Sequence, residues 1–197
     1  MKLLILYGTH YGYTEKIAHF LADEFRLGGY LVDVYDCTKT PLDIHLTSYD
    51  AYILGASVKK GQYPEAFRFW VKNNLWEFQG KHTAFFSVCL GILQGGNFKV
   101  QQEEEKIVKD FLAWSNWRPA MWVIFAGALS YSKYNWFLKR FMRSIARRAG
   151  VETEIGRDYE YTNWQEVRAF ALEFQKQQMA KRGVDILQLA PQESVTR

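Results

Sequence analysis

Short apolar runs alternate with helical patterns along most of the chain, and this alternation limits the possible folds more than any other feature. Residues 2–7 are apolar without polar alternation, which is typical of a strand buried on both faces of a parallel sheet. Residues 14–27 predict an amphipathic helix, and Gly28 and Gly29 predict its end, because glycine tolerates a left-handed backbone there. The apolar face of this helix carries Ile17, Leu21 and Phe25. With a further strand at residues 30–35, the beginning of the chain predicts one strand–helix–strand unit.

The same rhythm continues to about residue 181. The expected strands are residues 51–56, 83–88 and 121–128, and the expected helices are residues 64–73, 101–114 and about 164–181. Thr162-Asn163-Trp164-Gln165 fits a capping box at the start of the last helix. Strands that alternate with helices predict an α/β fold, with a doubly wound five-stranded parallel sheet and helices on both faces.

The length of the chain, 197 residues, fits one domain with an insertion. We expect a single domain over residues 1–182, with the insertion at residues 129–161 inside it. Residues 183–197 show no clear periodicity and are expected to form a loosely ordered tail.

Cysteine usage and hydropathy indicate the cytosol. Cys37 and Cys89 lie far apart without metal-ligand spacing, and no signal pattern precedes the first strand. The longest apolar stretch, residues 120–129, is about half the length of a membrane-spanning helix. We therefore expect reduced thiols and no segment that crosses a bilayer.

Positive charge is concentrated in the insertion rather than spread over the chain. The net charge is only +4, and the segment 131–150 contains basic side chains and no acidic ones. These basic residues are Lys133, Lys139, Arg140, Arg143, Arg147 and Arg148. The distribution indicates a local basic patch, and no nucleic-acid-binding motif accompanies it, so we expect no nucleic-acid partner.

On a helical wheel, residues 134–149 separate into an apolar face and a basic face. The apolar face carries Phe137, Leu138, Phe141, Met142 and Ile145, and the basic face carries Lys139, Arg140, Arg143 and Arg147. Trp136 falls among the basic residues. Three interpretations remain open. The apolar face packs on the domain, it binds a partner or another copy, or it docks on an anionic membrane surface, which a basic amphipathic helix suits.

The loop after the first strand offers groups that bind phosphate. Its residues are Thr9, His10, Tyr11, Gly12, Tyr13 and Thr14. Hydroxyl groups, a central glycine and unpaired N–H groups at a helix start all favour an anion. The alternative is a plain strand–helix turn in which Thr14 only caps the helix. The loop has neither the Gly-Lys-Ser/Thr end of a Walker loop nor a Gly-x-Gly-x-x-Gly pattern.

This loop resembles the flavodoxin phosphate loop, which runs Ser/Thr-x-Thr/Tyr-Gly-x-Thr. The resemblance covers residues 1 to about 130, and it implies a flavodoxin-like fold that holds FMN. It also implies that the loops after the third and fourth strands contact the flavin ring. The residues of these loops are Ala56, Ser57, Val58 and Lys59, then Ser87, Val88, Cys89, Leu90 and Gly91. From the residues alone, Ser57 and Ser87 could only satisfy loop backbone groups, and Cys89 could be a small buried apolar side chain.

A second resemblance covers residues 1 to about 175 and includes the insertion. Residues 55–63 and 126–131, with Phe86-Ser87-Val88, Trp117-Arg118-Pro119 and Tyr161-Thr162-Asn163-Trp164, resemble the menaquinone-dependent protoporphyrinogen IX dehydrogenases. The resemblance implies FMN-mediated removal of six electrons from protoporphyrinogen IX, passed to menaquinone or ubiquinone in the last oxidative step before haem. Because such a quinone lies in the bilayer, the resemblance favours the membrane interpretation of the basic helix. It implies a cytoplasmic protein, peripheral on the inner face of the cell membrane.

Two adjacent lysines follow the third strand. We hypothesise that Lys59 or Lys60, together with Arg118 or Lys133, pairs with the propionates of the substrate. The alternative for the two lysines is a solvated turn.

No catalytic triad, metal site or carboxylate pair is evident, and the scattered histidines are interpreted as ordinary surface or loop residues. His10 is the exception to watch, because it lies in the phosphate loop. Two other functions on this fold stay open: an electron carrier between protein partners, and an NAD(P)H:quinone reductase.

Overall fold

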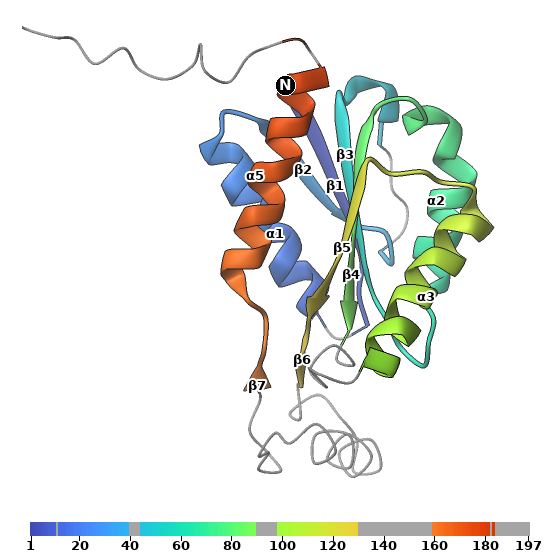
Figure 1. Ribbon diagram of the computed structural model, residues 1–197. Helices are drawn as coiled ribbons and strands as arrows, with labels where there is room; N and C mark the ends of the chain where they lie inside the picture. Colours follow the sequence, from blue (N-terminus) through green and yellow to red (C-terminus); the bar gives the residue numbers. More distant parts are fainter. Residues whose placement is uncertain (11, 40–43, 90–97, 130–158, 182, 184–197) are drawn as a thin grey trace, which may run out of the picture.

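In the computed structural model, a five-stranded parallel sheet lies between two layers of helices (Figure 1). The structure describes residues 1–10, 12–39, 44–89, 98–129, 159–181 and 183. The strands of the sheet are β1 (Lys2–Gly8), β2 (Leu31–Asp36), β3 (Ala51–Ser57), β4 (His82–Cys89) and β5 (Met121–Ala126). Their order is β2-β1-β3-β4-β5, and every neighbouring pair is parallel. The predicted doubly wound sheet is confirmed.

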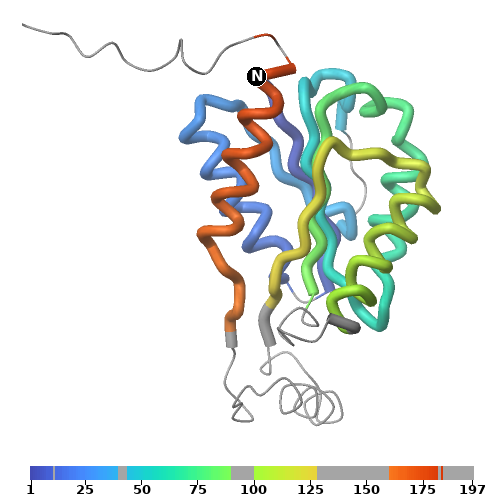
Figure 2. Tube along the Cα trace, in the orientation of Figure 1, coloured from blue at the N-terminus to red at the C-terminus, as the bar shows by residue number. Residues whose placement is uncertain are grey.

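The helices divide evenly between the two faces of the sheet (Figure 2). Helices α1 (Tyr13–Leu27) and α5 (Trp164–Lys181) cover one face, and α2 (Glu65–Phe78) and α3 (Phe98–Ser115) cover the other. A short 3-10 helix, η1 (Leu46–Ser48), precedes β3. A small antiparallel pair, β6 (Ala128–Leu129) and β7 (Tyr159–Glu160), follows β5.

Alternate residues of β1 point into two separate cores. Leu3 and Ile5 pack with α1 and α5, whereas Leu4 and Leu6 pack with α2 and α3. All four side chains are fully buried. A strand covered by helices on both faces has no solvent-facing side, and for this reason residues 2–7 show no polar alternation.

Helix α2 starts after Pro64, as predicted, but it ends at Phe78 rather than near residue 73. The Phe78 side chain is fully buried, and its ring lies 6.1 Å from that of Trp70 and 5.9 Å from that of Trp117. Packing of this last turn on the core therefore extends the helix through two asparagines, although asparagine has low helix propensity.

The capping box of α5 is shifted by one residue from the predicted one. The Gln165 N–H donates to Asn163 Oδ1 at 3.1 Å, and Asn163 Nδ2 donates to Glu166 Oε1 at 3.0 Å. Asn163 is thus the capping residue. The Thr162 hydroxyl instead donates to the Ala126 carbonyl at 2.9 Å, and so ties the start of α5 to the end of β5.

The two ends of the insertion lie side by side. The expected fifth strand, residues 121–128, is interrupted at Gly127, whose N–H donates to the Cys89 carbonyl at 2.9 Å and whose carbonyl accepts from the Tyr161 N–H at 3.3 Å. Beyond this point β6 pairs with β7. The predicted basic helix, residues 134–149, and the predicted tail, residues 183–197, lie outside the described residues, apart from Gly183. None of the described helices is long and apolar enough to cross a membrane.

Candidate functional site

Three loops begin at the carboxyl ends of β1, β3 and β4, at the lower end of the sheet in Figure 1. Gly8, the last residue of β1, pairs with Ala56 of β3, and Ser57 pairs with Val88 of β4. One residue further, the Val58 N–H donates to the Val88 carbonyl at 2.9 Å. The first loop therefore lies beside residues 56–59, and these lie beside residues 87–89. Ligands bind at this edge in open α/β sheets.

The first loop is closed by its own threonine and glycine. The Gly12 N–H donates to Thr9 Oγ1 at 2.9 Å. Gly12 has φ +89° and is the residue that caps α1, a left-handed conformation that favours glycine. The N–H groups of the following first turn, which begins at Tyr13, form the positive end of the α1 dipole. Tyr11 lies outside the described residues.

Thr14 is the residue of this loop that most clearly points to a ligand. Its side chain is fully buried, and its Oγ1 has no hydrogen-bond partner in the structure. Because Gly12 caps α1 and the helix begins at Tyr13, the interpretation of Thr14 as the cap is wrong. A buried hydroxyl without a partner costs about 1–3 kcal/mol, and a phosphate oxygen would supply the missing acceptor. The loop therefore fits the phosphate of a flavin mononucleotide.

His10 links the first loop to the second. Its backbone N–H donates to Ser57 Oγ at 3.3 Å, and its ring Nδ1 lies 3.4 Å from the same hydroxyl. Burial, with a smaller contribution from the charge of Lys59, lowers the pKa of His10, so the ring is neutral at pH 7. His10 is thus more than an ordinary loop histidine, and Ser57 bonds a side chain as well as backbone.

The two lysines after β3 belong to a tight turn, with Lys59 as its first residue and Lys60 as the first of its two central residues. The Lys59 N–H donates to the Gln62 carbonyl at 2.9 Å, and the Gln62 N–H donates back at 3.1 Å. The central residues Lys60 and Gly61 have φ of +52° and +75°, as this class of turn requires. Both lysine side chains are exposed, at the same edge of the sheet as the first loop.

The end of β4 carries two buried polar side chains that face α2 and α3. The Tyr63 hydroxyl donates to Ser87 Oγ at 2.9 Å. The Cys89 thiol is buried and hydrogen-bonds to the carboxyl group of Glu104, on α3. Leu90 and Gly91 lie outside the described residues. The third loop therefore begins at the predicted edge of the sheet. Ser87 and Cys89 are hydrogen-bonded there to Tyr63 and to Glu104, on the face covered by α2 and α3.

Glu160, which the sequence analysis missed, joins the first loop to the base of the insertion. Its carboxylate accepts from Lys16 Nζ at 2.6 Å, and it is also hydrogen-bonded to the side chains of Tyr13 and Trp164. Burial alone would raise the pKa of Glu160, but these hydrogen bonds, led by that of Lys16, outweigh it and lower the pKa. No local pattern could have identified this residue, because its partner Lys16 is 144 positions away.

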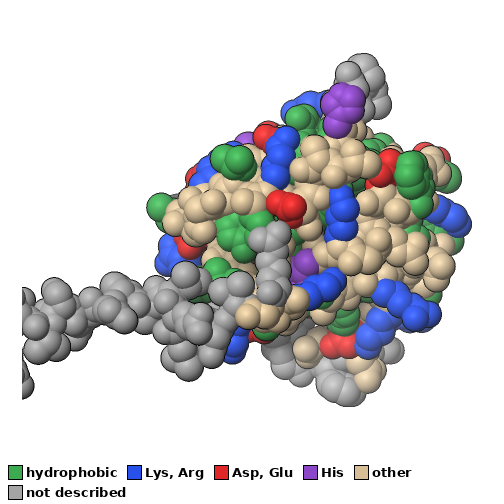
Figure 3. All heavy atoms as spheres, turned by 90° about the horizontal axis from the view of Figure 1, so that it is seen from above, with side chains coloured by type: hydrophobic (Ala, Val, Ile, Leu, Met, Phe, Trp, Pro, Cys, Tyr) green, Lys and Arg blue, Asp and Glu red, His purple; other side chains and the backbone are tan. Residues whose placement is uncertain are grey.

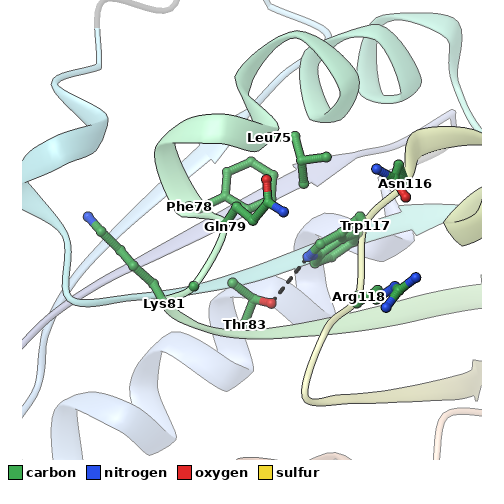
Figure 4. A pocket seen from close by; sticks show the side chains of 9 residues that line it. Leu75, Phe78, Gln79, Lys81, Thr83, Asn116, Trp117 and Arg118 are labelled. Carbon is green, nitrogen blue, oxygen red and sulfur yellow. Dashed lines mark hydrogen bonds between the residues drawn. The ribbon is translucent and has the colours of Figure 1, made fainter.

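Arg118 lies at the other end of the sheet. It precedes β5 and lines a cavity of about 260 Å³ beside Trp117, whose indole N–H donates to Thr83 Oγ1 at 3.1 Å (Figure 4). The eight residues of β4 separate this amino edge from Lys59, a distance of about 23 Å. The structure therefore does not bring Arg118 together with the two lysines, which leaves Lys133 as the other predicted partner of a propionate. Lys133 lies outside the described residues.

Among the described residues, side chains of both charges occur at the amino edge. Figure 3 looks down on this edge, and its basic, acidic and hydrophobic side chains are interspersed. Within the described ranges, no group of three or more histidine, cysteine, aspartate or glutamate side chains is arranged to hold a metal ion. The carboxyl edge is the candidate site, because Gly12, the buried Thr14 hydroxyl and the His10–Ser57 contact lie there.

Fold and loops together define a flavodoxin-type domain. A family model described as a flavodoxin domain matches residues 4–155. Flavodoxin 1 from Bacillus cereus is 18% identical, with a TM-score of 0.54 over 89% of this chain and 98% of its own. The rubredoxin oxygen:oxidoreductase of Desulfovibrio gigas is also 18% identical, with a TM-score of 0.53 over 93% of this chain and 37% of its own. These structures support the fold, and the domain indicates a flavin cofactor.

Two curated relatives narrow the class further. Protoporphyrinogen IX dehydrogenase (quinone) of Escherichia coli K12 is 33% identical over 173 residues, which are 88% of this chain and 94% of that protein. The protein of the same name from Leishmania major is 34% identical over 177 residues, 88% of this chain and 74% of that protein. This chain belongs to the protoporphyrinogen IX dehydrogenase (quinone) family, and it is an oxidoreductase, as the sequence predicted.

Proposed function

We propose that this chain is an FMN-dependent dehydrogenase that oxidises protoporphyrinogen IX to protoporphyrin IX and passes the six electrons to menaquinone or ubiquinone. The reaction would serve haem biosynthesis. The observation that carries the cofactor assignment is the buried, unpartnered Thr14 hydroxyl at the first turn of α1. The substrate and acceptor are inferred from the names of the family members.

In this proposal the phosphate is held by the first loop. The N–H groups at the start of α1 and the Thr14 hydroxyl would donate to it, while Gly12 lets the backbone turn beneath it. Residues 56–59 and 87–91 would line the flavin ring. FMN, when bound, supplies the two-electron redox chemistry, and the chain orients the reactants around it.

The proposed position of the substrate follows from the positive charges of Lys59 and Lys60. Protoporphyrinogen IX carries two propionates, and Lys59 and Lys60 are exposed cations at the edge where the ring of FMN would lie. The tight turn between Lys59 and Gln62 holds the two lysines on a defined backbone. We propose that they bind a propionate, without Arg118.

The proposed position of the quinone acceptor follows from the basic residues of the insertion. A quinone with an isoprenoid tail stays in the bilayer, so the protein must work at the membrane surface. We propose that the basic helix of residues 134–149 docks there. It would use Lys139, Arg140, Arg143 and Arg147 against anionic headgroups and Phe137, Leu138 and Phe141 in the acyl boundary. The protein would then be peripheral on the inner face of the cell membrane.

One experiment tests the proposal as a whole. The purified protein is examined by visible spectroscopy, and protoporphyrinogen IX is then added anaerobically with and without a soluble menaquinone analogue. We expect a flavin spectrum that bleaches on addition of the porphyrinogen and is restored by the quinone. A protein without flavin absorbance, or one whose flavin is reduced by NADPH but not by protoporphyrinogen IX, would contradict it.

A further inference from the structure

Glu104 differs from the acidic residues on either side of it in α3. Its Oε2 atom is enclosed by protein and has no hydrogen-bond partner in the structure, and the Cys89 thiol hydrogen-bonds to the carboxyl group. Glu105, by contrast, forms a helix-surface ion pair with Lys109 at 2.8 Å, and Glu103 is exposed. Among the described residues, no lysine or arginine forms an ion pair with Glu104.

The surroundings of the Glu104 carboxylate increase its affinity for a proton. Burial has the largest effect and raises the pKa of Glu104, the negative charge of Glu103 raises it further, and the hydrogen bond from Cys89 opposes both. Among the residues that the structure describes, Tyr63 also interacts electrostatically with Glu104, and its hydroxyl donates to Ser87. A buried carboxylate oxygen that accepts no hydrogen bond is costly in its charged form, so protonation at this oxygen is favoured.

Glu104 also lies at the edge where the flavin is proposed to bind. Its partner Cys89 is the last residue of β4, and the carbonyl of the preceding residue, Val88, accepts from Val58 of the second loop at 2.9 Å. The Cys89 side chain therefore connects the carboxyl edge of the central strands to Glu104 on α3.

The chemistry of the proposed reaction needs a titratable group of this kind. Each step removes two electrons and two protons from the porphyrinogen, breaking one C–H and one N–H bond. With FMN bound, one proton and the electron pair would pass to it, and the second proton would need an acceptor until the quinone takes both electrons and both protons to form the quinol. The two half-reactions then balance without exchange of a proton with the solvent.

We propose that Glu104 accepts this second proton on its carboxyl group, with Cys89 as the residue that positions it. The inference rests on the proposed function, because it presupposes FMN at the carboxyl edge. Reduction of the flavin adds negative charge near Glu104 and so favours uptake of the proton. Transfer of the electrons to quinone removes that charge and favours its release.

The test compares the FMN-loaded wild type with Glu104→Gln and with Glu103→Gln, which removes the same charge at an exposed neighbouring position. Midpoint potentials are measured by spectroelectrochemistry between pH 5 and 9. In the pH range where flavin reduction is coupled to protonation of Glu104, the wild-type midpoint potential should fall with pH about 30 mV per unit more steeply than outside that range. This extra slope corresponds to one additional proton taken up per two electrons. We expect this steeper segment in Glu103→Gln and its loss in Glu104→Gln.

Proton release provides a second readout. When porphyrinogen reduces the flavin in weakly buffered solution without quinone, Glu104→Gln should release about one more proton per flavin than the wild type does. If Glu104→Gln does not fold, Cys89→Ala serves instead. Loss of its hydrogen bond raises the pKa of Glu104 and should move the steeper segment to higher pH.

The assignment would be overturned by a Glu104→Gln protein that binds FMN and keeps the wild-type pH dependence. It would also be overturned if Glu103→Gln lost the steeper segment equally. Both results leave the proposed function standing. A wild-type protein that binds no FMN would instead contradict the proposed function. The visible spectrum reveals this before any potential is measured.

Discussion

The His10 imidazole and the Ser57 hydroxyl meet at 3.4 Å, although 47 positions separate the two residues in the chain. The His10 N–H donates to the same oxygen at 3.3 Å, so a single side chain of the second loop holds both the backbone and the ring of the first. Two loops that are proposed to grip opposite ends of one cofactor are thereby already positioned relative to each other. Such preorganisation lowers the entropy lost on binding.

Replacing Ser57 with alanine should weaken FMN binding without unfolding the protein. Loss of the hydroxyl frees the first loop from the second, and hydrogen bonds of this kind contribute about 1 kcal/mol, which corresponds to about a five-fold higher Kd. Fluorescence titration of the flavin-free protein measures the change. Ser48→Ala, at a hydroxyl bonded to the His45 carbonyl in η1, is the matched control and should leave the Kd unchanged. Equal Kd values for the two variants would refute the role of Ser57.

Thr14→Val should change stability and FMN affinity in opposite directions. Valine keeps the β-branched shape but removes the buried hydroxyl that has no partner, so the flavin-free protein should have an equal or higher Tm. Affinity for FMN should fall about ten-fold or more, because hydrogen bonds to charged groups contribute roughly 1.5–3 kcal/mol.

Thr83→Val is the control for Thr14, because its hydroxyl is paired with the Trp117 indole at 3.1 Å. It should lower the Tm and leave the FMN affinity unchanged. Calorimetry and flavin titration of both variants make the comparison. A Thr14→Val protein with lower stability and wild-type affinity would count against the phosphate site.

Glu160→Gln should reduce stability at neutral pH and have less effect in acid. The folded pKa of Glu160 lies below its unfolded value of about 4.3, so its carboxylate stabilises the folded state above that value. This contribution is lost as the pH falls through the unfolded value toward the folded pKa. The Tm difference between wild type and Glu160→Gln should therefore be largest near pH 7 and shrink below about pH 5. Glu173→Gln, which removes a carboxylate at an exposed position of α5, is the control variant.

Charge reversal at the two lysines and at Arg118 should have different effects on the KM for protoporphyrinogen IX. Lys59→Glu and Lys60→Glu are expected to raise the KM for protoporphyrinogen IX several-fold, because each places a carboxylate opposite a propionate. Arg118→Glu, at the amino edge, should leave the KM unchanged. Steady-state kinetics at fixed quinone concentration distinguish the variants. A KM raised by Arg118→Glu and not by either lysine variant would reverse this assignment.

Removal of positive charge from the insertion should abolish membrane binding. We expect the wild type to sediment with anionic liposomes at low salt and to be released at high salt, since surface electrostatics are screened by ions. Replacing Lys139, Arg140, Arg143 and Arg147 with glutamate should prevent sedimentation while leaving the flavin spectrum intact. Wild-type protein that stays in solution at low salt would contradict the docking proposal.

The sequence by itself determined the fold and the edge at which the site lies. Apolar runs such as residues 2–7 and the helical period of residues 14–27 are local patterns, and each reports burial of its own segment. Once the alternation predicts a parallel sheet, the loops after its strands must share one edge, so the positions of Thr9 and Ser57 followed without coordinates. The expected bounds erred where packing overrode propensity, as in the last turn of α2.

Only the tertiary structure decided which side chains meet. Lys59 and Arg118 could bind the same substrate as far as the sequence shows, yet β4 holds them at opposite edges of the sheet. The contact of Glu160 with Lys16 and that of Glu104 with Cys89 join segments that no local period relates. Such contacts depend on the packing of separate elements, and so does the burial that leaves the Thr14 hydroxyl without a partner. The chemistry of the site was therefore visible in the residue types, but their partners and pKa values were set by the fold.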